Sequence, residues 1–168
     1  MRVSLESDHW MLDEIGDVEW FMLVQLPEAA DFNQSEKGKK RILPDPTDDD
    51  EEVVADWKEF VQPEIETQFK ENLRIVSEDL DQAEEIDHGG AQLHRIQVPV
   101  DHAETWYSVL NQARLILNEE HNIANAEYEL FVGEQNPTEL GEKRWLLMVQ
   151  YRVYGAIQEF LLTNLMEG

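Results

Sequence analysis

Apolar side chains recur three or four residues apart along most of this 168-residue chain, and no other feature constrains its fold as strongly. In an α-helix this spacing gathers apolar side chains on one face, which must be buried against another element. The pattern predicts helices over about residues 8–26, 47–62, 63–87, 101–121 and 140–166. We therefore expect a mainly α fold, a bundle of four or five helices, in a single domain spanning residues 1–168.

Proline and capping residues set the limits of these helices. Pro27 ends the first helix, and a long loop is expected at about 27–47, where the helical spacing fails. Thr47 and Asp50 have the form of a capping box and predict the start of the second helix. Pro63 either kinks that helix or opens a third one at its first turn.

Alternating apolar and polar residues predict a small two- or three-stranded β element. The alternation is clearest at 95–98, and a further strand is predicted at 127–132. Residues 2–9 (RVSLESDH) resemble residues 95–102 (RIQVPVDH), because both look like a strand that leads into an aspartate-capped helix. We therefore expect the strand near 3–5 to lie beside the strand at 95–98.

The helical pattern also predicts which large side chains form the core. Each of these lies on the apolar side of its helix: Trp57, Phe69, Trp106, Leu110, Tyr154 and Phe160. The last helix is apolar nearly all round, which is typical of a helix buried on several sides. Arg152 and other polar residues interrupt its apolar run, so a transmembrane span is not expected.

The charge balance narrows the classes of partner. The chain has 37 acidic and 13 basic side chains, which gives a net charge of −24. We exclude nucleic acids and anionic membranes as partners, because binding to phosphates depends on lysine and arginine. The acidity fits solubility in a salty environment, a basic protein partner, or mimicry of nucleic acid. Because 42% of the residues are apolar, the acidity does not imply disorder.

No motif of a known catalytic centre occurs in the sequence. The chain has no cysteine, which excludes disulfides and thiolate chemistry. It also has no P-loop, nucleophile elbow or Gly-x-Gly-x-x-Gly motif. The first ten residues lack the basic and apolar segments of a signal peptide, so we expect a cytoplasmic location. We predict no catalytic residue, no cofactor and no metal site, and favour a non-enzymatic protein.

Two Glu-x-x-His pairs, Glu6 with His9 and Glu85 with His88, support the main alternative. Two such pairs that face inward from helices, with two further glutamates, can hold a pair of metal ions in a helical bundle. The alternative is therefore a metal-binding or enzymatic helical bundle. About one residue in five is acidic, however, so such pairs also arise by chance.

Two arginines are candidate binding residues. Arg114 lies between apolar residues of its helix, where a half-buried guanidinium needs a carboxylate or carbonyl partner. A structural ion pair is the favoured interpretation, and a binding role is the alternative. Arg41 closes the basic stretch at 37–41, which is either a solvated loop or a segment that docks on an acidic helix.

Three stretches resemble a bacterial family known as domain-of-unknown-function family number twenty-seventeen. They are RILPDP at 41–46, with DDE at 49–51 and WKEF at 57–60; WYSVLNQARLIL at 106–117; and YGAIQEFL at 154–161. The sequence departs from the family at Gln62-Pro63 and in an extended segment at 31–40.

The resemblance implies no reaction. In many actinobacteria such genes lie beside that of the Clp protease adaptor, which implies a role near regulated proteolysis. With the acidity, this leads to our functional hypothesis: a cytoplasmic, non-enzymatic interaction or regulatory protein with a protein partner that is basic. Homo-oligomerisation is left open.

Overall fold

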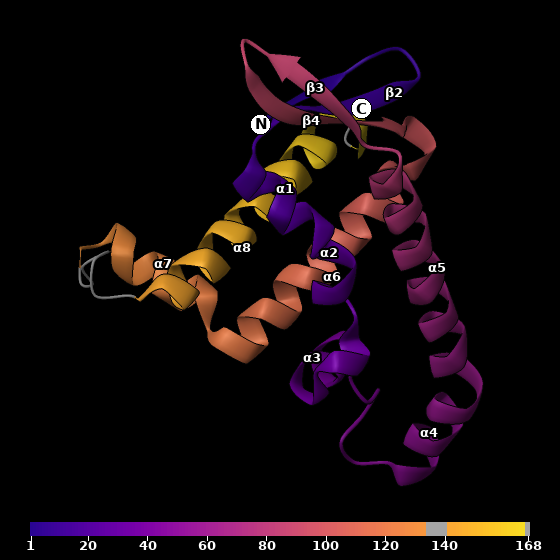
Figure 1. The fold of residues 1–168 in the computed structure, drawn as a ribbon. Helices are drawn as coiled ribbons and strands as arrows, with labels where there is room; N and C mark the ends of the chain where they lie inside the picture. Colours follow the sequence, from indigo (N-terminus) through magenta and orange to yellow (C-terminus); the bar gives the residue numbers. More distant parts are fainter. Residues whose placement is uncertain (134–140, 167–168) are drawn as a thin grey trace.

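The computed structural model describes residues 1–133 and 141–166, and places a small sheet at one end of a set of packed helices (Figure 1). The sheet is antiparallel, with the strand order β1-β2-β4-β3. Its strands are β1 (Arg2–Leu5), β2 (His9–Ile15), β3 (Glu84–His88) and β4 (Ala91–Pro99). Four strands exceed the two or three that the sequence predicts.

Helices make up most of the described chain, as predicted. They are α1 (Asp17–Val24), α2 (Leu26–Ala29), α3 (Glu36–Ile42), α4 (Glu51–Asp56), α5 (Gln62–Asp81), α6 (Ala103–His121), α7 (Ile123–Phe131) and α8 (Glu142–Leu161). A turn of π-helix joins α4 to α5 (Trp57–Val61), and another follows α8 (Leu162–Met166). The predicted count of four or five helices is too low, because several short helices lie between the long ones.

The predicted first helix at 8–26 is wrong in its first half. Residues 9–15 form β2, and helical structure begins only at Asp17. A bulge interrupts the pairing of β2 with β4, since the register shifts by one residue between Leu12 and Ile15. The bulge contains Glu14, whose φ of 53° is left-handed. The extra residue returns Ile15 to the core side that Leu12 also faces.

The predicted neighbour of the first strand is also wrong. β1 pairs with β2, and β2 lies between β1 and β4. The helix expected to run to residue 87 ends at Asp81, and residues 84–88 form β3. Gly89 and Gly90, both with positive φ, form the turn that joins β3 to β4.

The strand predicted at 127–132 is α7, a helix. The segment 27–47, expected as a loop, contains most of α2 and all of α3. Asp50, not Thr47, caps α4, because its Oδ1 accepts the backbone N–H groups of Glu52 and Val53. Pro63 lies in the first turn of α5.

The helices predicted at 101–121 and 140–166 are confirmed as α6 and α8, while Leu140 lies outside the described residues. Within residues 1–133 and 141–166, every helix is too short or too polar to cross a bilayer.

The core lies between the sheet and the helices below it. Trp10, Leu12 and Ile15 of β2 pack with Ile96 and Val98 of β4 and with buried residues of α6 and α8. Of the predicted core residues, Trp106, Leu110 and Tyr154 are confirmed as fully buried. Trp57, Phe69 and Phe160 are only half-buried.

Candidate functional site

Arg114, one of the two predicted binding residues, lies on α6 where that helix packs against α8. Its Nη1 donates to Oε1 of Gln158 at 2.7 Å, and its Cζ lies 4.3 Å from the centroid of the Tyr151 ring. The expected ion pair is wrong, since Arg114 has no carboxylate partner among the described residues. An amide oxygen and an aromatic face take its place.

The guanidinium lies against α8 at Gly155. A Cβ at this position would be 3.4 Å from both Cζ and Nε of Arg114, a contact at the tight end of the normal range. Nε of Arg114 is buried and has no acceptor in the part of the chain that the structure describes. The guanidinium is therefore held by packing and by one hydrogen bond, with donors left over.

A cleft of about 590 Å³ opens beside Arg114, within the size range of small-molecule sites. α6 contributes Tyr107, Asn111 and Arg114, α7 contributes Glu127, and α8 contributes Tyr151, Arg152, Gly155, Ala156, Gln158 and Glu159, with Leu162 just beyond it. Arg152 is paired within the cleft wall, because its Nε lies 2.5 Å from Oε1 of Glu127. The unpaired cation of the cleft, within the described residues, is Arg114.

Arg41, the other predicted binding residue, is exposed on α3 and lies 3.5 Å from Oε1 of Glu119 on α6. Lys39 of the same helix lies 3.3 Å from Oε1 of Glu66 on α5. The basic stretch is thus a helix docked on carboxylates and not a solvated loop. Glu119 and Arg114 are about 140° apart around α6, so the structure does not bring Arg41 and Arg114 together.

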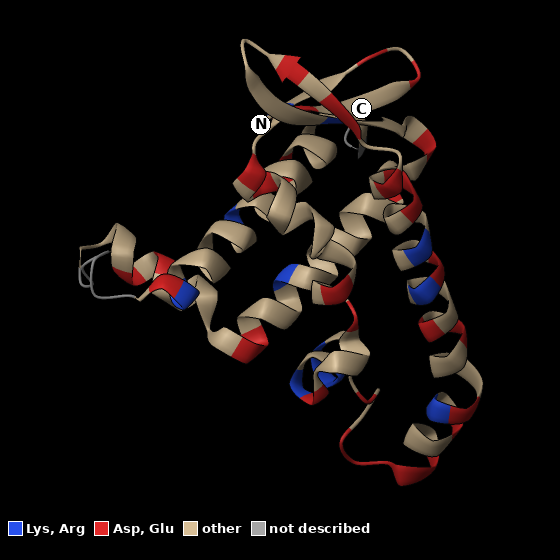
Figure 2. Cartoon of the chain, viewed as in Figure 1, with Lys and Arg blue, Asp and Glu red and all other residues tan. Residues whose placement is uncertain are grey.

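A second candidate surface is the segment 45–64, which we call the acidic arm. It comprises the connection before α4, α4 itself, the π-helical turn and the first residues of α5. It contains nine carboxylates and one lysine, and all nine carboxylate residues are exposed. Figure 2 shows this concentration of acidic residues at the end of the molecule opposite the sheet. Its lysine, Lys58, lies 3.0 Å from Oδ1 of Asp45.

The acidic arm also exposes apolar side chains. Phe60 is 66% exposed, Val53 46% and Val61 42%. Trp57 fixes the arm to the body, because it packs on the buried cluster formed by Phe32, Leu43 and Ile116. The arm therefore presents an apolar strip with carboxylates beside it on an anchored helix.

The Glu-x-x-His pairs do not form a metal site of the kind considered above. Glu6 lies in the turn before β2, His9 begins β2, and Glu85 and His88 lie in β3, with β4 between the two strands. Residues three apart on a strand point to opposite faces, unlike residues three apart on a helix. Throughout residues 1–133 and 141–166, no three side chains of His, Asp or Glu are grouped to hold a metal ion.

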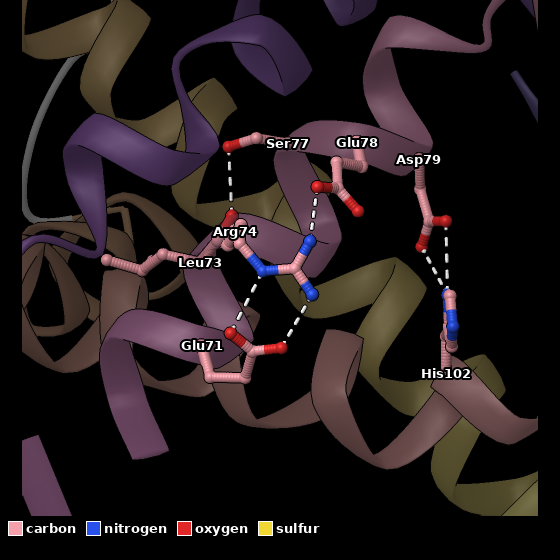
Figure 3. Close-up of polar contacts among 7 residues, drawn as sticks. All are labelled: Glu71, Leu73, Arg74, Ser77, Glu78, Asp79 and His102. Atoms are coloured by element: carbon pink, nitrogen blue, oxygen red, sulfur yellow. Dashed lines mark hydrogen bonds and ion pairs between the residues drawn. The ribbon is translucent and has the colours of Figure 1, made fainter. Parts of the chain in front are cut away.

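Sequence reasoning missed a buried polar cluster around Asp79 of α5. Its Oδ2 accepts a hydrogen bond from Nε1 of Trp106 at 2.7 Å. The same oxygen lies 2.9 Å from Nδ1 of His102 (Figure 3). A signal was present, because Asn72, Val76, Asp79 and Leu80 share the helical spacing of one buried face. A charged residue on such a face requires partners. The same view shows Arg74 between Glu71 and Glu78 on the exposed side of α5.

A second missed cluster joins three strands. Asp13 of β2 is 2% exposed and accepts from Nε and Nη2 of Arg95 on β4, both at 3.0 Å, and from Nη2 of Arg2 on β1 at 2.9 Å. Its Oδ1 also accepts the backbone N–H of Glu14. The hydrogen bonds from Arg95 lower the pKa of Asp13 to about 2, against the opposing effect of burial.

These features define a class of protein: a mainly helical fold with a small antiparallel sheet, whose candidate sites are an open cleft and an exposed arm. The chain belongs to the family described as Domain of unknown function (DUF2017), whose family model matches residues 9–165. The match spans all three stretches that carry the resemblance at the level of sequence. Comparisons with curated proteins and with solved structures gave no match.

Proposed function

We propose that this protein is a non-enzymatic interaction protein that binds a basic, amphipathic segment of a partner protein along the acidic arm. Its place of action is the cytoplasm, and the family's genomic association favours a partner within the Clp degradation machinery. The proposal rests on one observation: Phe60, Val53 and Val61 are exposed on the acidic arm, whose charged residues are all carboxylates except Lys58.

Apolar and acidic groups together favour a partner that carries the opposite charges and its own apolar face. Burial of apolar area supplies affinity, while complementary charge speeds the encounter and selects the partner. A charged surface without exposed apolar side chains would serve solubility alone. Phe60 is therefore the residue that distinguishes an interaction surface from a merely soluble one.

The chain's own basic helix supports this mode of recognition. Lys39 and Arg41 of α3 pair with carboxylates of α5 and α6, and the Lys39 ammonium lies 5.6 Å from the ring centroid of Phe32. A basic helix thus already packs on acidic helices in this fold. The acidic arm offers the same chemistry to a second chain.

The test compares two variants that each remove an exposed phenylalanine. Phe60→Ser changes the acidic arm, whereas Phe131→Ser changes α7, where Phe131 is 88% exposed. Tagged protein would capture partners from the native host at low and high salt, and mass spectrometry would identify them. We expect a basic partner that is captured by the Phe131→Ser variant, lost from the Phe60→Ser variant and released by salt.

Two outcomes would count against the proposal. Equal capture by both variants would place the interaction elsewhere on the protein. Absence of any partner from wild-type protein would remove the interaction role. Absence of Clp subunits and adaptor among specific partners would remove the Clp link while leaving the interaction itself in place.

A further inference from the structure

We propose that the cleft between α6 and α8 binds a small organic acid, with Arg114 as the residue that pairs with its carboxylate. This inference is independent of the acidic arm, because the cleft lies on other elements of the fold. It begins with an unpaired charge: a guanidinium is a cation, yet that of Arg114 has no carboxylate partner among the described residues. Other arginines of this protein pair with carboxylates: Arg95 pairs with Asp13, and Arg152 pairs with Glu127.

Arg114 determines which way the amide groups of Gln158 and Asn111 are turned. A guanidinium only donates hydrogen bonds, so Gln158 must accept from it through Oε1. Nε2 of Gln158 then donates to Oδ1 of Asn111 at 3.2 Å. This order leaves Nδ2 of Asn111 as a donor without an acceptor among the described residues. The cleft therefore carries two kinds of spare donor, guanidinium N–H and amide N–H, which suit an anion.

The charges around the cleft favour a carboxylate over a phosphate. Arg152 is already neutralised by Glu127, and Glu159 also lines the cleft. The four charged residues of the cleft thus sum to zero, so a single negative charge paired with Arg114 meets less repulsion there than a phosphate dianion would. The planar fork of a guanidinium also matches the plane of a carboxylate.

The apolar residues that line the cleft indicate the chemical nature of the rest of the ligand. Tyr107, Ala156 and Leu162 give the cleft an apolar side, and Leu162 is 37% exposed. One face of Tyr151 is already covered by the guanidinium. A ring or a short hydrocarbon chain attached to the carboxylate would cover the remaining apolar surface.

The test uses benzoate as the probe, benzamide as its uncharged counterpart, and inorganic phosphate as the competing anion. Titration into the 168-residue protein would be followed by calorimetry and by the NMR signal of the Arg114 Nε–H group. We expect saturable binding of benzoate with a shift of that signal, and much weaker binding of benzamide and phosphate. Benzoate that fails to bind at millimolar concentration, or that binds no better than benzamide or phosphate, would overturn the proposal.

Variants assign the binding to Arg114. Arg114→Met is expected to weaken benzoate binding at least about tenfold, because a charged hydrogen bond is lost. Arg152→Met is the matched control in the same cleft and should bind benzoate nearly as well as wild type. An equal loss in both variants would show attraction by general positive charge and would also overturn the proposal. Thermal melting reports the folding of each variant, and the NMR titration of wild type tests the site without any substitution.

Discussion

A single carboxylate, that of Asp13, links three of the four strands. Its partners Arg2 and Arg95 come from the strands on either side, and both reach it from the solvent side of the sheet. The Arg95 side chain is one-third exposed, so part of the cost of burying the ion pair is avoided. This residue lies next to the bulge, where regular pairing of β2 and β4 is interrupted. The ion pairs thus stabilise the sheet where its backbone hydrogen bonds are incomplete.

Asp13 predicts a specific response to acid. Its folded pKa of about 2 is below the usual unfolded value, so its contribution is complete above about pH 4 and disappears as the pH falls toward 2. The shift corresponds to about 2 kcal/mol of unfolding free energy. We expect the Asp13→Asn variant to have an unfolding free energy about 2 kcal/mol below that of wild type at pH 7. At pH 2 the two proteins should have almost the same unfolding free energy.

Urea unfolding of both proteins from pH 2 to 7 measures this difference. Protonation of other carboxylates affects both proteins alike and cancels in the comparison. Asp49→Asn, which removes an exposed carboxylate of the acidic arm, is the control. A wild-type and Asp13→Asn difference that stays constant across the pH range would contradict the assigned role.

Single residues also show how far the sequence predicts the candidate sites. Arg114 stands out in the sequence because a cation among apolar residues requires a partner, and the structure confirms that it is half-buried. The identity of the partner did not follow, since Gln158 and Tyr151 lie about 40 residues away and neither is charged. The contact of Gly155 with Arg114 could not be predicted either, because it depends on how α6 packs on α8.

At the level of elements, the long helices followed from the sequence and β2 did not. Core residues of a regular strand are two apart, but the bulge at Glu14 spaces Leu12 and Ile15 three apart. With Met22 and Leu26 further along, this spacing imitates one helical face. The opposite error occurred in α7, where Tyr128 and Leu130 alternate with acidic residues although Ile123 and Ala126 are the buried ones.

The bulge leads to a prediction for β2. Deletion of Glu14 would restore simple alternation and turn Ile15 away from the core, because a shift by one residue exchanges the two faces of a strand. We expect a loss of about 3 kcal/mol or more of unfolding free energy, comparable to emptying one large core position. Glu14→Gly should be tolerated and nearly neutral, since glycine adopts the observed left-handed φ without strain.

Chemical denaturation of the two variants checks this expectation. A deletion variant as stable as wild type would mean that the register of β2 is set elsewhere. A strongly destabilised Glu14→Gly variant would show that the glutamate side chain, and not the backbone conformation, is what the bulge requires.

At the scale of the molecule, the charge is unevenly distributed. Acidic residues are dense on the acidic arm, while the surfaces of α6 and α8 in Figure 2 carry few. A net charge of −24 opposes the compact state through self-repulsion, which salt screens. The charge count was available from the sequence. Its concentration on an anchored helix was not, because that depends on how Trp57 packs on the body.

Self-repulsion predicts that salt stabilises the fold. Raising potassium chloride from about 10 mM to 300 mM shortens the screening length severalfold, and we expect the melting temperature to rise by about 4 °C. A variant with Asp48, Asp49, Glu51 and Glu52 changed to their amides should show a smaller rise. Thermal melts followed by circular dichroism measure both, and a fall in melting temperature with salt would show that attractive ion pairs dominate instead.

The order of the strands has a consequence for synthesis on the ribosome. β2 pairs with β4, yet helices α1 to α5 and strand β3 lie between the two strands in the chain. At ordinary translation rates, roughly 4 to 15 seconds pass between the emergence of the end of β2 and the start of β4. During that interval one edge of β2 lacks its partner, and Trp10 and Leu12 lack the sheet neighbours that help to bury them. Glu6, Asp8 and Glu14 flank this apolar segment and disfavour its association with other nascent chains, so the local negative charge protects the chain before it has folded.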